Sequence, residues 1–407
     1  MKLRSVTLSL FSALLLALIL TISARSARQR DYQDGDRSSN LREHGLKSPV
    51  KLVGAISVPG NRLRFDISWV DEARARYYLA ESGNAAVDVF DAQKDRFLGR
   101  ITPGFKGLGG GACGPIEGMG PSGILVTPDN HLWVADFPGK VWAFDLSKPQ
   151  PPFGKLNPMA APLSTGASCR SDEIGYDPKD HVIVAGNPGD NPPFATFISS
   201  DPPFQVLGKI TFSTAAKFAF TATGLEQPLW VPELERFFVP VQGESQGVLA
   251  VLKVDKSAAQ KVTIEKTYST PSCNGSGLAL GPLRHLLVGC DDGKPLLIMN
   301  AQDGKIIKTI PQIHGSDEVW YNSGDRLFYA ASGAAPNPAL GVIDAETSTF
   351  VQTIPSGPNA HSVAAFAKSN HIFVPIGAPN PKAPVNSNAC VKFGLPESNG
   401  CIAVYGH

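Results

Sequence analysis

One stretch of this chain contains four short runs: Asp317-Glu-Val-Trp-Tyr-Asn322, Arg326-Leu-Phe-Tyr-Ala-Ala331, Leu340-Gly-Val-Ile-Asp344 and Phe350-Val-Gln-Thr-Ile354. The runs are rich in residues that favour strands, and a polar turn, Ser323-Gly-Asp325, separates the first run from the second. The four-run unit recurs along the chain at a period of roughly 50 residues. Four short strands per unit at such a period predict a β-propeller, in which each unit forms one blade.

The second run of the unit occurs seven times and is its most apolar part. The seven copies are Arg76-Tyr-Tyr-Leu-Ala80, His131-Leu-Trp-Val-Ala135, His181-Val-Ile-Val-Ala185, Arg236-Phe-Phe-Val-Pro240, His285-Leu-Leu-Val-Gly289, Arg326-Leu-Phe-Tyr-Ala330 and His371-Ile-Phe-Val-Pro375. Such nearly continuous apolar runs predict strands that are covered on both faces by the neighbouring blades.

The seventh unit is incomplete at the C-terminal end. Its second run is followed by only one more β-rich run, Ile402-Ala-Val-Tyr405. A matching run lies near the other end of the chain, Lys51-Leu-Val-Gly-Ala-Ile-Ser57. We expect these two runs to pair, because closing the ring removes the exposed sheet edges. The predicted fold class is therefore all-β, a seven-bladed β-propeller closed by an N-terminal strand (a velcro closure).

The N-terminal residues predict export. Lys2 and Arg4 precede an apolar stretch, so we interpret residues 1–27 as a secretory signal peptide. An uncleaved membrane anchor is the alternative, but the stretch is short for a spanning helix. Residues 28–50 are polar and predict a flexible lead-in, and residues 51–407 are assigned to the propeller. The expected location is secreted or periplasmic, with no membrane span in the mature chain.

Composition narrows the partners. The chain has 37 Lys and Arg against 36 Asp and Glu, a formal net charge of +1, and it contains no basic run. A nucleic-acid partner is therefore not expected. The sequence has no Cys-x-x-Cys-His motif, and its Gly107-Leu-Gly-Gly-Gly-Ala112 loop lacks the lysine of a phosphate-binding loop. Neither haem nor a nucleotide is expected, and we expect a monomer.

Six cysteines in an exported chain predict disulfides, with reduced thiols as the alternative. In a propeller, the loops that join blades and the loops between second and third strands lie on one face. This placement brings together the cysteines of neighbouring loops on that face, and the last two cysteines flank the loop before the final strand. The predicted pairs are Cys113–Cys169, Cys273–Cys290 and Cys390–Cys401.

The first strands of the units line the central channel, and their starts face the mouth with the long loops. Aligned on the second strands, these starting positions are Phe65 or Asp66, Ser122, Asp172 or Glu173, Glu226, Ser276, Asp317 or Glu318, and His361. Carboxylate oxygens with one histidine suit Ca²⁺, Mg²⁺ or Mn²⁺. We predict one divalent cation held by Asp172, Glu226 and Asp317; a channel that holds only water is the alternative.

His361 is the candidate general base at this mouth. It lies in the loop Pro358-Asn-Ala-His361, which leads into a first strand. Four other histidines, namely His131, His181, His285 and His371, all enter second strands. Their equivalent placement predicts a role in turns on the opposite face rather than a shared metal site.

Two stretches resemble the NHL and YVTN-type repeats of exported propellers: Ser122-Gly-Ile-Leu-Val-Thr-Pro-Asp-Asn-His-Leu-Trp-Val-Ala-Asp136 and Gly357-Pro-Asn-Ala-His-Ser-Val-Ala-Ala365. The resemblance covers most of residues 51–405. A related group, the gluconolactonase-like propellers, holds one divalent cation in the channel, which implies Glu226 and Asp317 as acidic ligands. Virginiamycin-B-lyase-like propellers use His and Glu near the channel mouth, which implies His361 and Glu318 as catalytic residues.

The sequence leaves the class of function open. The favoured hypothesis is an exported propeller that binds a small molecule or a protein on its loop-rich face. The rival is a divalent-metal-dependent lactonase or lyase, in which the predicted cation activates the substrate and His361 transfers a proton. A structural scaffold is the third class.

Overall fold

The structure of the protein is a computed structural model. It describes residues 48–147, 153, 156–213, 218, 220–244, 246–258, 260–291 and 293–407. The predicted signal peptide and most of the predicted lead-in lie outside these residues, so both stay predictions. No helix in the described ranges is long and apolar enough to cross a membrane.

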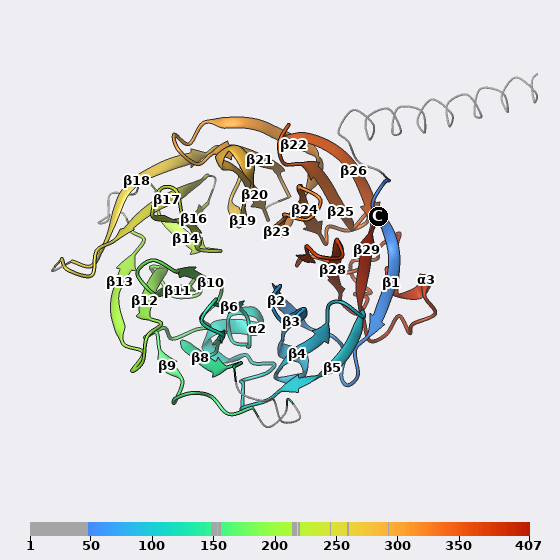
Figure 1. Ribbon diagram of the computed structural model, residues 1–407, viewed down its shortest axis with the longest axis horizontal. Helices are drawn as coiled ribbons and strands as arrows, with labels where there is room; N and C mark the ends of the chain where they lie inside the picture. The colour runs from blue at the N-terminus through green and yellow to red at the C-terminus, as the bar shows by residue number, and fades with distance from the viewer. Residues whose placement is uncertain are drawn as a thin grey trace, which may run out of the picture. The chain divides into compact units, whose positions relative to one another are not determined.

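Seven antiparallel sheets surround a central channel in the unit Val50–Gly406 (Figure 1). Blade 1 contains β2 (Phe65–Asp71), β3 (Arg76–Glu81), β4 (Ala86–Asp91) and β5 (Arg96–Ile101). Blade 2 contains β6 (Ile124–Val126), β7 (His131–Asp136), β8 (Lys140–Asp145) and β9 (Leu163–Ser164). Blade 3 contains β10 (Ile174–Asp177), β11 (Val182–Asn187), β12 (Phe194–Ser199) and β13 (Val206–Thr211).

The remaining blades repeat this order from the channel outward. Blade 4 contains β14 (Ala222–Leu225), β15 (Leu229–Val231), β16 (Arg236–Gly243), β17 (Gly247–Val254) and β18 (Val262–Thr270). Blade 5 contains β19 (Gly275–Leu280), β20 (His285–Cys290), β21 (Pro295–Asn300) and β22 (Ile306–His314). Blade 6 contains β23 (Ser316–Asn322), β24 (Leu327–Ser332), β25 (Ala339–Asp344) and β26 (Thr349–Pro355). The predicted seven-bladed propeller is confirmed.

Blade 7 is built from both ends of the chain. It contains β27 (Ala364–Phe366), β28 (His371–Ile376), β29 (Cys401–Gly406) and, as its outer strand, β1 (Lys51–Ser57). β1 and β29 run antiparallel, with Ile56 opposite Ile402. The predicted closure by an N-terminal strand is therefore confirmed.

The core lies between neighbouring blades. The second strands are almost entirely buried, as their apolar runs predict. Between blades 3 and 4, for example, Phe197 of β12 meets Phe237 of β16 with ring centroids 6.3 Å apart. Because two neighbours together cover both faces of each blade, the ring is held by a series of such interfaces.

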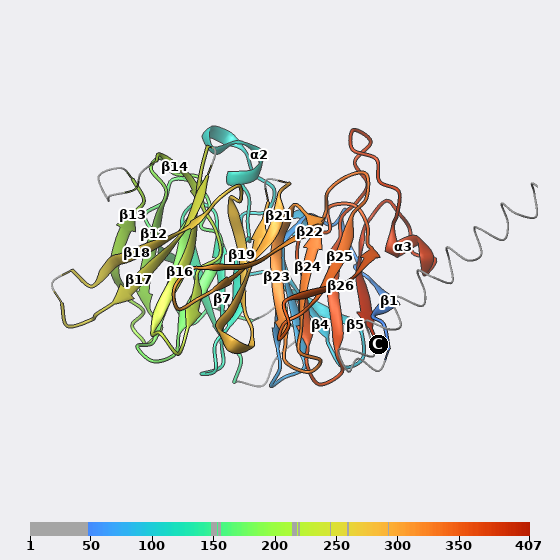
Figure 2. The ribbon, with the colours of Figure 1, turned by 90° about the horizontal axis from the view of Figure 1, so that it is seen from above.

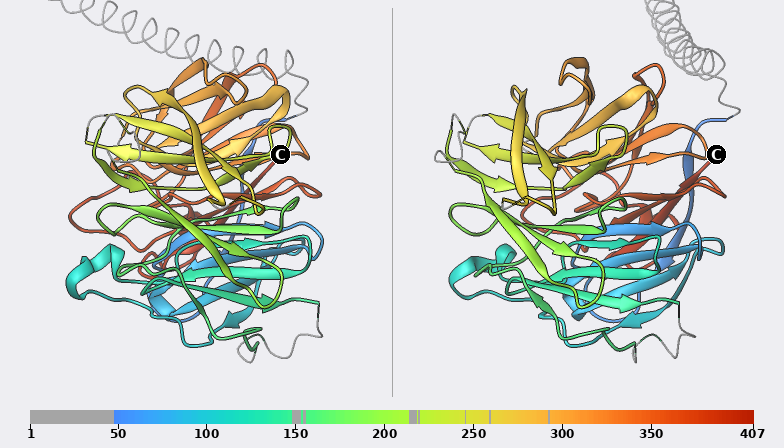
Figure 3. Two further views of the ribbon diagram at one scale, coloured as in Figure 1. Left: turned by 90° about the vertical axis from the view of Figure 1, so that its left-hand side faces the viewer. Right: turned by 60° about the vertical axis from the view of Figure 1, so that its left-hand side comes forward.

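The cysteines form the three disulfides that the propeller predicted. The Cα atoms are 5.7 Å apart in Cys113–Cys169, 5.2 Å apart in Cys273–Cys290 and 5.8 Å apart in Cys390–Cys401. The first disulfide anchors the short helix α2 (Gly114–Glu117), and the third anchors α3 (Ala389–Lys392). α2 projects from one face of the ring in the side views (Figures 2 and 3). We call the channel opening on this face the mouth.

Candidate metal centre

The first strands of several blades carry the same irregularity near the mouth. The register with the second strand shifts between Phe65 and Ser68 in β2, between Gly275 and Leu278 in β19, and between Ser316 and Val319 in β23. A bulge of this kind sets two residues opposite one and redirects a side chain. It places Asp66, Ser276 and Asp317 at equivalent positions of three blades.

Blade 3 has the same arrangement directly before β10. The amide of Asp172 donates to the carbonyl of Gly186 (2.9 Å), and the amide of Gly186 donates to the carbonyl of Glu173 (3.0 Å). Two consecutive acids therefore stand opposite one residue. Asp172 corresponds in position to Asp317 of blade 6, and Glu173 corresponds to Glu318.

A cavity of about 1300 Å³ lies at the mouth. Seven of the predicted mouth positions contribute to its lining: Phe65, Asp66, Asp172, Glu173, Glu226, Asp317 and His361. Further carboxylates come from Glu117 and Asp291, and guanidinium groups come from Arg62, Arg64 and Arg170. The predicted Ser122 and Ser276 are buried and are not among the lining residues. Seven carboxylates against three guanidinium groups favour the binding of a cation.

Arg170 is the functional residue that the sequence analysis missed. Its buried guanidinium forms ion pairs with Asp66, with Asp172 (2.7 Å) and with Glu117 (3.2 Å). No spacing pattern distinguishes this arginine, because it follows Cys169 in an irregular loop and two of its three partners, Glu117 and Asp66, lie 53 and 104 residues away in the chain. Arg170 pairs with Oδ2 of Asp172, whereas Oδ1 of Asp172 has no hydrogen-bond partner among the described residues.

Both carboxylate oxygens of Glu173 are buried without a hydrogen-bond donor among the described residues. Its side chain is buried, with 2% of the residue exposed. Glu226 and Asp317 lie close to it. One oxygen from each of these three residues lies within 4.8 Å of the other two.

Burial and mutual repulsion act on this group together. Burial raises the pKa of Glu173 well above its usual range, and the negative charges of Glu226 and Asp317 raise that pKa further. Burial likewise raises the pKa of Glu226 and of Asp317. Ionised carboxylates so close together need a compensating positive charge, which a proton or a cation can supply. The three oxygens fit the ligand chemistry of a hard divalent cation.

His361 also lies at the mouth. Its Nε2 is 3.9 Å from Oδ1 of Asp66, and its ring stacks on Phe65 with centroids 4.7 Å apart. One atom each of Asp66, Asp317 and His361 lies within 4.8 Å of the other two. The mouth therefore brings His361 together with the acids, as the alignment of the units predicts.

Glu318 is placed differently. It is fully buried, and its Oε2 accepts hydrogen bonds from the hydroxyl of Ser362, the amide of Val363 (3.0 Å) and the hydroxyl of Ser68 (3.5 Å). Burial raises the pKa of Glu318 to about 8. Glu318 is not among the residues that line the mouth cavity. The structure therefore does not bring its carboxylate to the cavity that His361 faces, and a joint catalytic role gains no support from the geometry.

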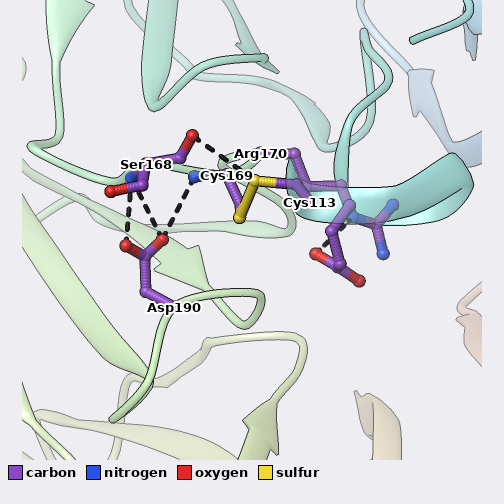
Figure 4. Close-up of a disulfide and its surroundings, with 6 residues drawn as sticks. Cys113, Ser168, Cys169, Arg170 and Asp190 are labelled. Atoms are coloured by element: carbon purple, nitrogen blue, oxygen red, sulfur yellow. Dashed lines mark hydrogen bonds and ion pairs between the residues drawn. A yellow bond between two sulfur atoms is a disulfide. The ribbon is translucent and has the colours of Figure 1, made fainter. Parts of the chain in front are cut away.

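The loop that carries α2 overhangs the mouth. The disulfide between Cys113 and Cys169 ties this loop to blade 3, and Asp190 accepts hydrogen bonds from the amides of Ser168 (3.0 Å) and Cys169 (3.3 Å) beside it (Figure 4). Two aliphatic side chains of this loop, Leu108 and Ile116, line the cavity and are 58% and 55% exposed. The mouth thus combines an acidic floor with an apolar rim.

Two tryptophans from the first strands of different blades contact each other. Trp69 of β2 and Trp320 of β23 meet edge to face, with ring centroids 5.2 Å apart. Trp69 also packs against the core between blades 2 and 3, while Trp320 packs against the core between blades 1 and 7. β2 belongs to blade 1 and β23 to blade 6, so this contact joins the two blades that flank blade 7.

Comparisons with known proteins bear on the fold. No family model and no curated protein matches the chain. Among solved structures, U3-55K has a TM-score of 0.58 at 9% identity, covering 87% of this chain and 98% of its own. A chain of the mitotic checkpoint complex has a TM-score of 0.60 at 11% identity, covering 88% of this chain and 92% of its own. At such low identity the likeness shows the fold alone, and the class of protein is a seven-bladed β-propeller.

Proposed function

We propose that this protein is an exported propeller that binds a ligand at its mouth through a divalent cation held by Glu173, Glu226 and Asp317. The observation that carries the proposal is the buried Glu173 carboxylate, which has no hydrogen-bond partner among the described residues. Leaving such a group unsatisfied costs stability, whereas a cation would use both the charge and the oxygens.

The proposed ligand set differs in one residue from the set that the sequence predicts. Glu226 and Asp317 are kept, and Glu173 replaces Asp172, because Glu173 has an oxygen within 4.8 Å of oxygens of both Glu226 and Asp317 and that group does not include Asp172. Three carboxylates and no nitrogen or sulfur favour Ca²⁺, Mg²⁺ or Mn²⁺ over softer ions. When bound, such an ion would polarise an oxygen of the ligand.

The size and lining of the mouth restrict the kinds of ligand that it can bind. A cavity of about 1300 Å³ admits a small molecule or a protruding segment of a partner protein. The acidic floor favours a ligand that offers an oxygen to the cation, and the exposed Leu108 and Ile116 favour an apolar part near the rim. The binding role rests on these two features.

Thermal melting tests the proposal. The mature protein is stripped of metal with EDTA and then melted alone or with Ca²⁺, Mg²⁺ or Mn²⁺. We expect at least one cation to raise the melting temperature by mass action, and we expect Glu173→Gln to remove that rise. Glu233→Gln is the matched control, because Glu233 is an exposed acid of the same blade as Glu226. Identical curves in every condition, with metal-free wild type by elemental analysis, would contradict the proposal.

An enzymatic role is the second candidate, and the position of His361 favours it. Its Nδ1 contacts the carbonyl oxygen of Asn359 at 2.9 Å, so Nε2 of the neutral ring can accept a proton from a bound molecule. A cation at the carboxylates would polarise a substrate carbonyl, as a lactonase or lyase requires. A screen of lactones should then show turnover by the Mn²⁺-loaded wild type that His361→Gln loses. Turnover that is equal in both proteins would exclude His361 as the base.

We also propose that the protein is exported and that it belongs to the NHL or YVTN group of propellers. The three disulfides support an oxidising compartment, because such bonds are rare in the cytosol. Secretion of the full chain, with cleavage near residue 27 detected by N-terminal sequencing, is the expected result. Retention of an intact N-terminus in the purified protein would favour the membrane anchor instead.

A further inference from the structure

A second group of ligand atoms lies beside the first at the mouth. Asp66, Asp317 and His361 each offer one atom, and the three atoms lie within 4.8 Å of one another. These residues belong to blades 1, 6 and 7, which are consecutive around the closed ring. Asp317 belongs to this group and also to the group of Glu173 and Glu226, so it connects the two.

The imidazole of His361 presents one nitrogen to this group. Its Nδ1 lies 2.9 Å from the carbonyl oxygen of Asn359. A carbonyl oxygen can only accept, so Nδ1 carries the proton and Nε2 of the neutral ring keeps its lone pair, which is the form that binds metal ions. Stacking on Phe65, with only 9° between the ring planes, holds the imidazole in this orientation.

The spacing of His361 and Asp66 suits a shared ion better than a hydrogen bond. Nε2 is 3.9 Å from Oδ1 of Asp66, which exceeds hydrogen-bond distance. Two atoms that bind one ion at about 2.0–2.2 Å lie about 3–4 Å apart. Arg170 pairs with the other oxygen of Asp66, Oδ2, so Oδ1 remains for the ion.

Two buried acids give independent support for cations at this mouth. Glu173 and Asp172 are each 2% exposed, and both line the cavity. Neither oxygen of Glu173 has a hydrogen-bond partner in the described part of the chain, and the same holds for Oδ1 of Asp172. Asp317 therefore shares the cavity with buried carboxylate oxygens that have no hydrogen-bond donor among the described residues.

We infer that the mouth holds two cations that share Asp317, the first with Glu173 and Glu226 and the second with Asp66 and His361. The inference rests on the proposed function for the first ion. The imidazole makes the second position suited to Mn²⁺ or Zn²⁺ rather than Ca²⁺, which prefers oxygen ligands alone. A carboxylate between two ions is the arrangement found in two-metal sites, which bind an oxygen of the ligand from both ions.

Counting bound Mn²⁺ tests the inference. The mature protein is stripped with EDTA, dialysed against Mn²⁺ and assayed for metal per chain, and electron paramagnetic resonance then reports whether the ions are coupled. We expect two coupled ions in the wild type and in the control Glu233→Gln. His361→Gln and, independently, Asp66→Asn should each retain one uncoupled ion. Asp317→Asn should weaken binding at both positions.

The outcomes separate the two proposals. If the wild type binds one ion and His361→Gln still binds it, the inference of two ions is wrong and the proposed function stands. No ion in a folded wild type overturns both. Two uncoupled ions, or two ions that persist in both His361→Gln and Asp66→Asn, would place the second ion elsewhere and overturn the inference. Circular dichroism confirms that each variant is folded before its metal is counted.

Discussion

Glu173 of blade 3 and Glu318 of blade 6 occupy the same position of the repeat and have opposite surroundings. Each is the second residue of a bulge beside the mouth, and each is buried. Oε2 of Glu318 accepts hydrogen bonds from Ser362 and Val363 of the next blade, whereas its Oε1 has no partner among the described residues. Next to Glu173, the following blade offers Glu226 instead, and neither oxygen of Glu173 has a partner among the described residues.

The difference shows that the neighbouring blade decides what a repeated acid does. The bulge fixes the direction of the side chain in both blades, so the backbone is not the cause. A hydroxyl and an amide turn Glu318 into a link between blades 6 and 7. Glu173 instead has the carboxylate of Glu226 beside it, so it belongs to a group of acids that needs a compensating positive charge. Function at the mouth is therefore set between blades rather than within them.

The largest expected effect comes from opening the ring that supports Glu318. Ser362 and Val363 precede β27 in blade 7, and β1 completes that blade. Deleting residues 28–57 removes β1, exposes the edge of β29 and should abolish soluble, folded protein. Deletion of residues 28–47 alone is the control. Size-exclusion chromatography and thermal melting measure whether folded protein remains. A truncation lacking β1 that melts like the mature protein would contradict the role of β1 in closing the ring.

The next largest effect concerns cation affinity. Glu173→Gln removes a charged ligand and should weaken Mn²⁺ binding by about 100-fold or more, which corresponds to about 2.7 kcal/mol. Glu318→Gln should leave the affinity unchanged, because its acceptor oxygen serves Ser362 and Val363. Titration calorimetry of both variants measures the contrast. Equal losses in both variants would mean that the two acids are not functionally distinct.

The fold could be predicted from the sequence because it depends on repetition. Seven apolar second runs and a spare N-terminal strand determine the blades and their closure, and the closed ring determines which cysteines meet. The two-residue β9 (Leu163–Ser164) and the division of the first strand of blade 4 into β14 and β15 could not be predicted. Short or interrupted strands depart from the repeat, so the repeat period cannot predict where they occur.

The site could be predicted only as far as the repeat reaches. Alignment of the units places Asp66, Glu226, Asp317 and His361 at the mouth, where the structure also has them. The choice between Asp172 and Glu173 depends on which of them has an oxygen close to both Glu226 and Asp317, and these acids come from blades 3, 4 and 6. Contacts of this kind join residues that are far apart in the chain and follow no period, so the sequence does not contain a signal for them.

A smaller effect should follow from removing one partner of Glu318. Ser362→Ala deletes the hydroxyl that donates to Oε2 and leaves the buried carboxylate with fewer donors. We expect the free energy of unfolding to fall by about 1–3 kcal/mol. Urea denaturation in EDTA measures the loss, and Ser398→Ala, at an exposed position, is the control. If the two serine variants unfold at the same urea concentration, then the link between blades 6 and 7 is not what stabilises Glu318.

The smallest expected effect is the change in stability for each unit of pH. Burial raises the pKa of Glu318 to about 8 in the folded protein, against 4.5 for the ordinary group. Between these two values the folded state holds the proton more tightly than the unfolded state, so stability falls as pH rises. Between pH 6 and 7 this one group should lower the free energy of unfolding by about 1.4 kcal/mol.

Glu318→Gln isolates this contribution, because glutamine keeps the acceptor oxygen and does not titrate. In EDTA, wild type and variant should be similarly stable near pH 5, and the variant should become the more stable protein as pH rises towards 8. Urea denaturation at several pH values gives the difference directly, and other titrating groups cancel in it. A difference that stays constant with pH would show that Glu318 is ionised throughout. Its hydrogen bonds to Ser362 and Val363 would then outweigh its burial, and the contrast with Glu173 would be sharper still.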